Sequence, residues 1–122
     1  MKIRDITYAV RSWAEKYAQK NHFPDDLCGM CGIASVKLWK ELNKANFKIT
    51  IVCNDEHVFL ESKKYIIDIT ATQYGIKEHL IVKKNIRRKS FWAADFIFAD
   101  PDDFIQHQKK VGWPNDQIYD AE

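Results

Sequence analysis

The chain contains 122 residues with a net charge of +2, and 46% of them are hydrophobic, 13% aromatic and 30% charged. A chain of this size can bury roughly two-thirds of its unfolded surface, so a single domain over residues 1–122 is expected. The low glycine and proline counts, 4 and 3, exclude a collagen-like or low-complexity chain. The net charge is too small to favour a nucleic-acid partner, and none is expected.

The sequence also indicates where the protein is located and whether its cysteines are reduced. No apolar run approaches the roughly 20 residues that span a bilayer, so a soluble protein without membrane contact is expected. The residues from Met1 to Asp5 precede no apolar segment of the kind that a secretory signal contains. The expected location is the cytoplasm, or a destination reached through a signal that this sequence does not carry. Three cysteines cannot all pair, which favours reduced thiols with a chemical role.

Two amphipathic helices are predicted in the N-terminal part of the chain. Over residues 3–18 apolar side chains recur every three or four positions, and Pro24 lies beyond the end of this pattern. A loop with two glycines follows. A second periodic segment begins at or near Cys31 and ends between Asn43 and Asn46.

From Phe47 onward the period changes from 3.6 to 2 and β-branched residues dominate, which predicts strands. The segment 91–98 fits either a strand or a short helix. Asp100 followed by Pro101 predicts the start of a helix over residues 101–111. Together these patterns predict an α+β fold in which the N-terminal helices pack on an antiparallel sheet. The other strands are expected at residues 49–53, 57–62, 65–70 and 79–82.

A predicted hairpin brings a histidine and an aspartate together. If Lys63 and Lys64 form a two-residue turn, residue 60 faces residue 67 and residue 61 faces residue 66. His57 and Asp68 then lie diagonally on one face of the hairpin, within reach of a hydrogen bond. The opposite face carries the aliphatic residues that a core requires.

Cys31, His57 and Asp68 supply the groups of a cysteine-based catalytic triad. A thiolate is favoured at a helix N-terminus and beside an imidazolium, and Cys31 opens the second predicted helix. His57 would exchange a proton with the thiol, and Asp68 would orient the imidazole. Such a site uses no cofactor or metal, and none is expected. Cys28 stays an alternative nucleophile, whereas Cys53 is expected in the core.

The segments 29–35, 57–61 and 65–74 resemble the transglutaminase-like branch of the papain-like cysteine hydrolases. In that family a cysteine opens a helix, a histidine begins a strand, and the aspartate lies on the next strand. The resemblance covers about residues 27–75. It implies a papain-like or transglutaminase-like fold and acyl transfer through a thioester. The intervals between the three residues are shorter than in large family members, which leaves the substrate class open.

The reaction favoured by this resemblance is hydrolysis of a glutamine side chain of a protein, as in toxin or effector deamidases. So small a chain has little room for an extended peptide groove. A cysteine peptidase and a transglutaminase of the same fold are the alternatives, and all three would act on a protein or peptide substrate. Thr72 and Gln73 either line the site or cap a turn.

Three further interpretations use the same residues or their neighbours. The motif at 28–31 resembles the start of a thioredoxin-like redox site, but a polar loop precedes it where that fold has a buried strand. A zinc site would use the two cysteines of this motif with His57 and a fourth ligand that is not identified. A non-enzymatic alternative is a binding module with an idle triad, which would use Phe91 and Trp92 or the basic run 83–89. That run contains no interleaved aromatic residues, so a solvated loop is the simpler explanation.

Overall fold

The computed structural model describes residues 2–76, 81–84 and 90–118. Within these residues the strands form one antiparallel sheet in the order β4-β3-β2-β1-β5. The strands are β1 (Thr50–Cys53), β2 (Val58–Glu61), β3 (Tyr65–Ile67), β4 (Ile81–Lys83) and β5 (Phe96–Phe98). The α-helices are α1 (Ile3–Lys20), α2 (Cys31–Lys44) and α3 (Pro101–Val111), and the 3-10 helices are η1 (Ala71–Tyr74), η2 (Ser90–Trp92) and η3 (Asn115–Gln117).

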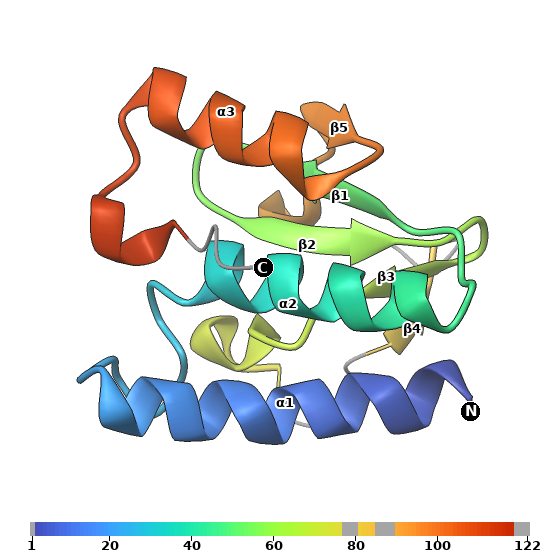
Figure 1. Cartoon of the computed structure of the whole chain (residues 1–122), viewed down its shortest axis with the longest axis horizontal. Helices are drawn as coiled ribbons and strands as arrows, with labels where there is room; N and C mark the ends of the chain where they lie inside the picture. Colours follow the sequence, from blue (N-terminus) through green and yellow to red (C-terminus); the bar gives the residue numbers. More distant parts are fainter. Residues whose placement is uncertain (1, 77–80, 85–89, 119–122) are drawn as a thin grey trace.

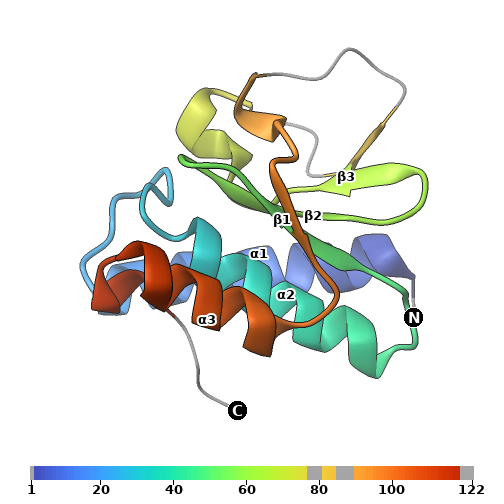
Figure 2. The ribbon, with the colours of Figure 1, turned by 90° about the horizontal axis from the view of Figure 1, so that it is seen from above.

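The sheet separates two layers of unequal size (Figure 2). The three α-helices lie on one face, and η1 and η2 lie on the other. α2 packs directly on β1 and β2, and α1 packs on α2 (Figure 1). The predicted α+β architecture, with N-terminal helices on an antiparallel sheet, is therefore confirmed. The smaller layer holds a separate buried cluster of Val52, Phe59, Ile66, Ala71 and Trp92.

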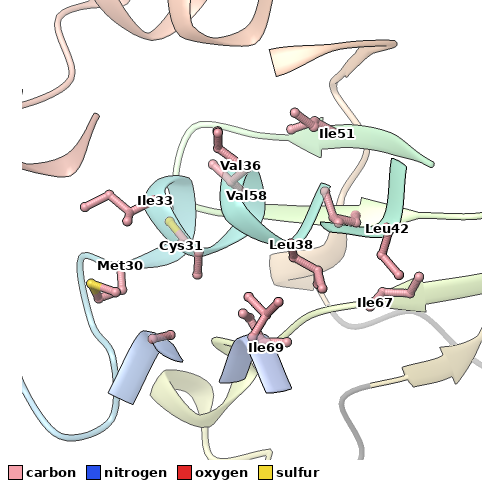
Figure 3. Close-up of a cluster of buried hydrophobic side chains, with 14 of the residues drawn as sticks. Met30, Cys31, Ile33, Val36, Leu38, Leu42, Ile51, Val58, Ile67 and Ile69 are labelled. Carbon is pink, nitrogen blue, oxygen red and sulfur yellow. The ribbon is translucent and has the colours of Figure 1, made fainter. Parts of the chain in front are cut away.

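The large core lies between α2 and the sheet (Figure 3). Leu38 and Leu42 of α2 lie among aliphatic side chains of the β2–β3 hairpin and its continuation, including Ile67 and Ile69. Each such buried side chain contributes about 1.5–3 kcal/mol relative to exposure. Cys31 belongs to the same cluster, so the first turn of α2 is held against the sheet by the core itself.

The helix boundaries follow local chemistry. α1 continues to Lys20, two residues beyond the predicted end, and α2 begins at Cys31 as predicted. α3 begins at Pro101, where the Asp100 side chain accepts the backbone N–H of Asp103 at 3.1 Å. This bond satisfies one of the N–H groups that a helix N-terminus leaves free.

The hairpin has the predicted turn and register. Leu60 lies opposite Ile67 in the β2–β3 ladder. The Ser62 N–H donates to the carbonyl of Tyr65 at 2.9 Å, which closes the two-residue turn. The aliphatic face of the hairpin lies in the large core, as the alternation of side chains along its two strands predicts.

Some strands are shorter than predicted. β3 ends before Asp68 because the side chain of Asp68 accepts the backbone N–H of Thr70 at 3.0 Å, a local turn that competes with the ladder. The segment 91–98 contains both predicted alternatives, a 3-10 turn and then a strand that pairs with β1. The first two residues of the strand expected at 79–82 lie outside the described residues.

The basic run 83–89 is described only at its start. Lys83 is exposed, and Lys84 forms an ion pair with Glu61 at 3.1 Å. Residues 85–89 lie outside the described part of the chain. Of the helices in the described part, none has the length and apolar character that crossing a membrane would require.

Candidate functional site

Cys31 occupies the first position of α2, with its side chain nearly buried at 4% exposure. The preceding residue, Met30, has no side-chain oxygen that could cap the helix, and no acidic residue lies in the first turn. The backbone N–H groups of this turn therefore keep their positive partial charge. This environment favours negative charge on a sulfur or an oxygen atom at Cys31.

A tight turn before α2 separates the two cysteines of the motif. The Met30 N–H donates to the carbonyl of Leu27 at 2.9 Å, and Gly29 within this turn has φ +87°, which a side chain would oppose. Leu27 is fully buried and anchors the turn in the core. Cys28 is consequently exposed while Cys31 points inward.

His57 and Asp68 form a buried pair, as the predicted register of the hairpin implies. His57 Nε2 lies 2.6 Å from Asp68 Oδ2, and neither side chain is more than 2% exposed. Asp68 Oδ2 also accepts the indole N–H of Trp92 at 2.8 Å. Its other oxygen accepts the backbone N–H and the hydroxyl of Thr70 at 3.0 and 3.2 Å. The carboxylate is thus held by four hydrogen bonds.

The electrostatics favour a protonated His57. Burial lowers the pKa of His57, but the charge of Asp68 and its hydrogen bond, with a further contribution from the neighbouring Cys31, raise the pKa to about 9. The second ring nitrogen, Nδ1, is buried and forms no hydrogen bond with a described residue. Asp68 therefore occupies one side of the imidazole and leaves Nδ1 free to exchange a proton with the adjacent thiol.

Aromatic rings fix the imidazole from several sides. Tyr74 and Phe91 stack with their ring centroids 4.2 Å apart, and both present T-shaped contacts to His57 at 4.9 and 6.0 Å. Phe59 lies parallel to the imidazole at 5.8 Å. Burial raises the pKa of Tyr74 to about 12, with a contribution from the charge of Cys31. These contacts hold the ring in one orientation.

Asn54 joins the turn that carries His57 to the segment that carries the aromatic residues. Its side-chain oxygen accepts the His57 N–H at 3.0 Å. Its amide nitrogen donates to the carbonyls of Phe91 and Ala93 at 3.1 and 3.0 Å. One side chain therefore sets the distance between the β1–β2 turn and η2.

Cys31 lies in the wall of a cleft of about 580 Å³. Gln73 lines this cleft, as one sequence alternative predicts, whereas the Thr72 hydroxyl donates to the carbonyl of Asp26 at 3.0 Å. The C-terminal segment supplies the opposite wall, which sequence reasoning missed. The lining residues are Cys28, Gly29, Cys31, Asp55, Glu56, Gln73, Tyr74, Val111, Gly112, Trp113, Pro114 and Gln117.

A close approach at Gly32 brings α3 and η3 to this wall. A Cβ atom on residue 32 would lie 2.6 Å from Nε2 of Gln108 and 3.1 Å from the carbonyl oxygen of Gln117. Gln108 is fully buried, and its amide has no hydrogen-bond partner among the described residues. A side chain at position 32 would therefore displace the Gln108 amide or the backbone of Gln117, which lines the cleft.

The structure brings Cys31, His57 and Asp68 to one place and puts Cys53 in the core, as predicted. Of the two aromatic residues that the binding-module alternative would offer to a partner, Trp92 is buried and Phe91 is half-buried. Trp92 is 5% exposed and donates to Asp68, and Phe91 stacks on Tyr74. No local pattern in the sequence indicated that Trp92 and Asn54 belong to the site.

The other interpretations of the 28–31 motif gain no support. A helix and a loop precede the motif, where a thioredoxin-like site would have a strand. Within the described residues no three His, Cys, Asp or Glu side chains are grouped closely enough to hold a metal ion.

Comparisons with family models, with curated proteins and with solved structures found no match to this chain. The resemblance to transglutaminase-like hydrolases therefore stays a prediction.

Proposed function

We propose that this protein is a cysteine amide hydrolase of papain-like or transglutaminase-like fold, acting on a glutamine side chain of a protein substrate. One observation carries the proposal. A fully buried histidine is held by Asp68 through one ring nitrogen, while its other nitrogen is unpartnered beside a cysteine at the start of a helix. This arrangement matches the roles of a nucleophile, a proton carrier and an orienting carboxylate.

The chemistry follows from these positions. The Cys31 sulfur attacks the carboxamide carbon, and the N–H groups at the start of α2 stabilise the resulting oxyanion. In the resting site His57 Nδ1 already holds the proton of the Cys31 thiol, and it delivers this proton to the departing nitrogen, which leaves as ammonia. Water then adds to the thioester and gives a proton to His57, which releases the carboxylic acid and restores the Cys31 thiolate beside a protonated His57. The net reaction converts an amide and water into an acid and ammonia.

A peptidase and a transglutaminase would use the same groups. Cleavage of a backbone amide releases an amine in place of ammonia, and an amine acceptor in place of water gives a new amide. The cleft of about 580 Å³ is small for an extended peptide, which favours a side-chain amide as the substrate.

The first test measures how fast iodoacetamide alkylates Cys31 between pH 5 and pH 9, with each cysteine resolved by mass spectrometry. We expect a rate that stays high at pH 6 in the wild type and falls at least about tenfold in His57→Ala and Asp68→Ala, because an imidazolium stabilises the thiolate. A rate that rises only above pH 8 and ignores both substitutions would sink the proposal and favour an idle binding module.

The second test measures products from glutamine-containing proteins. Ammonia release, amine incorporation and chain cleavage distinguish the deamidase, the transglutaminase and the peptidase. Cys31→Ala should abolish whichever activity is found, while Cys28→Ser should retain turnover. Loss of activity in Cys28→Ser alone would make Cys28 the nucleophile.

A further inference from the structure

The wall of the Cys31 cleft carries two carboxylates and, among its described residues, no cationic side chain. Asp55 and Glu56 both line the cleft and are exposed. Neither forms an ion pair with any described residue. Exposed carboxylates on a cleft wall attract cations more strongly than isolated surface charges do, because the low-dielectric walls focus their field.

Both acids are held close to the reacting groups. They occupy the β1–β2 turn immediately before His57, and Asn54 fixes this turn by accepting the N–H groups of Glu56 and His57 at 2.9 and 3.0 Å. The negative charges of Asp55 and Glu56 affect the pKa values of neighbouring side chains. Burial and then the charges of Cys31 and Glu56 raise the pKa of Tyr74 to about 12. Burial and then the charges of Cys31, Asp95 and Asp55 raise the pKa of Cys53 to about 11.

Aromatic residues complement the acids. Tyr74 and Trp113 line the same wall and are half-buried. Ammonium and guanidinium groups bind both carboxylates and aromatic faces. Cys31 lines this cleft and neighbours the buried His57, so a group that enters the cleft meets the proposed nucleophile.

We propose that the cleft selects substrates in which an alkylammonium or guanidinium group accompanies the reacting amide, with Asp55 and Glu56 as the groups that bind it. The cation is either a lysine or arginine next to the target glutamine or the amine of an acceptor molecule. This inference rests on the proposed function, because it takes Cys31 as the nucleophile. It adds a charge preference that the triad alone does not determine.

Charged thiol reagents test the preference without any substrate. The rates at which cationic trimethylammonium-ethyl, neutral methyl and anionic sulfonatoethyl methanethiosulfonate modify Cys31 are compared with the rates for a free cysteine peptide. All proteins carry Cys28→Ser, and mass spectrometry resolves the site. We expect the cation-to-anion rate ratio to exceed that of the peptide by about tenfold at low ionic strength.

Matched variants identify the groups responsible. Asp55→Asn with Glu56→Gln should return the ratio close to that of the peptide. Asp102→Asn with Asp103→Asn removes the same two charges at the far end of α3 and should leave the ratio high. A wild-type ratio equal to the peptide's, or a high ratio that survives the double substitution, would overturn the proposal.

Turnover then distinguishes the two sources of the cation. Ammonia release from glutamine peptides flanked by lysine or arginine, compared with glutamate or alanine, tests a neighbouring side chain. Incorporation of a primary amine into the neutral peptide tests an acceptor. We expect at least about fivefold selectivity for a cation in one arm, reduced in the double variant. A preference for the peptide flanked by glutamate would overturn the charge inference but leave the proposed hydrolase activity intact. If no amide is turned over, the proposed function fails, while the rate ratios of the thiol reagents still test the role of Asp55 and Glu56.

Discussion

At the scale of single residues, the charge state of His57 affects the stability of the fold and is central to the proposed chemistry. Its pKa is raised from 6.5 in the unfolded chain to about 9 in the folded protein, so the folded state holds the proton more tightly. The resulting stabilisation is fully present below about pH 6.5 and is lost as the pH rises through about 9. Asp68 is the group that reverses the effect of burial.

We expect Asp68→Asn to bring the pKa of His57 from about 9 to 6.5 or below, because burial then acts with little opposing charge. NMR titration of the imidazole C–H resonances measures this value in the variant and in the wild type. The loss of stability in Asp68→Asn should be largest below pH 6.5 and shrink toward pH 10. An unchanged His57 titration would show that the pair does not form.

Trp92→Phe tests the indole hydrogen bond to Asp68. Hydrogen bonds to charged groups contribute about 1.5–3 kcal/mol, so the free energy of unfolding should fall by about that amount. The His57-dependent alkylation of Cys31 should also slow. Trp39→Phe is the matched control, since Trp39 donates to the neutral carbonyl of Ile49 at 2.9 Å. The control should cost about 1 kcal/mol and leave alkylation unaffected, and equal effects on alkylation in the two variants would contradict the positioning role.

At the scale of elements, the start of α2 must satisfy two demands. Its apolar residues must fill the core, and its first turn must leave room for α3 and η3 at the edge of the cleft. Gly32 meets the second demand although glycine weakens a helix by about 1 kcal/mol relative to alanine. The packing of three elements at this point therefore outweighs the intrinsic preference of one of them.

Gly32→Ala should lower the free energy of unfolding by about 1–3 kcal/mol in urea denaturation, because the new methyl group meets Gln108 and the Gln117 carbonyl. Gln108→Ala in the same chain should recover part of this loss, which a double-mutant cycle measures. A stabilising Gly32→Ala would mean that helix propensity dominates and that α3 does not press on α2.

At the scale of the whole molecule, Arg11 connects parts that the chain separates widely. From α1 its guanidinium donates to the carbonyl of Ile69 at 2.6 Å and to the hydroxyl of Thr72 at 2.9 Å. The same hydroxyl donates to Asp26, in the loop before α2. One cation therefore holds the segment after Asp68 against the loop that leads to Cys31.

Arg11→Met keeps most of the aliphatic stem and removes these donors. We expect a loss of about 2–3 kcal/mol in the free energy of unfolding, because the bonds are charge-assisted and partly buried. Alkylation of Cys31 should lose part of its dependence on His57. Arg4→Met on the same helix removes a guanidinium that lies 5.2 Å from the Tyr8 ring, and should cost at most about 1 kcal/mol. Equal losses in both variants would refute the connecting role.

Local patterns in the sequence were sufficient for much of the architecture. The period of apolar residues located α1 and α2, and the Asp100-Pro101 pair located α3. The alternation of the hairpin was enough to pair His57 with Asp68, because a two-residue turn leaves only one register that buries the aliphatic face. These features depend on residues that are close in sequence or that lie on paired strands of one hairpin.

Only the tertiary structure decided what surrounds the triad. Trp92 reaches Asp68 across 24 residues, and Asn54 reaches Phe91 across 37. One wall of the cleft comes from residues 111–117, beyond the segment that resembles a known family. No periodicity predicts such contacts, because they depend on how the helix layer, the sheet and the 3-10 turns pack together. The sequence by itself therefore determined which residues form the candidate triad, whereas packing decided their partners, their protonation and the charge of the cleft.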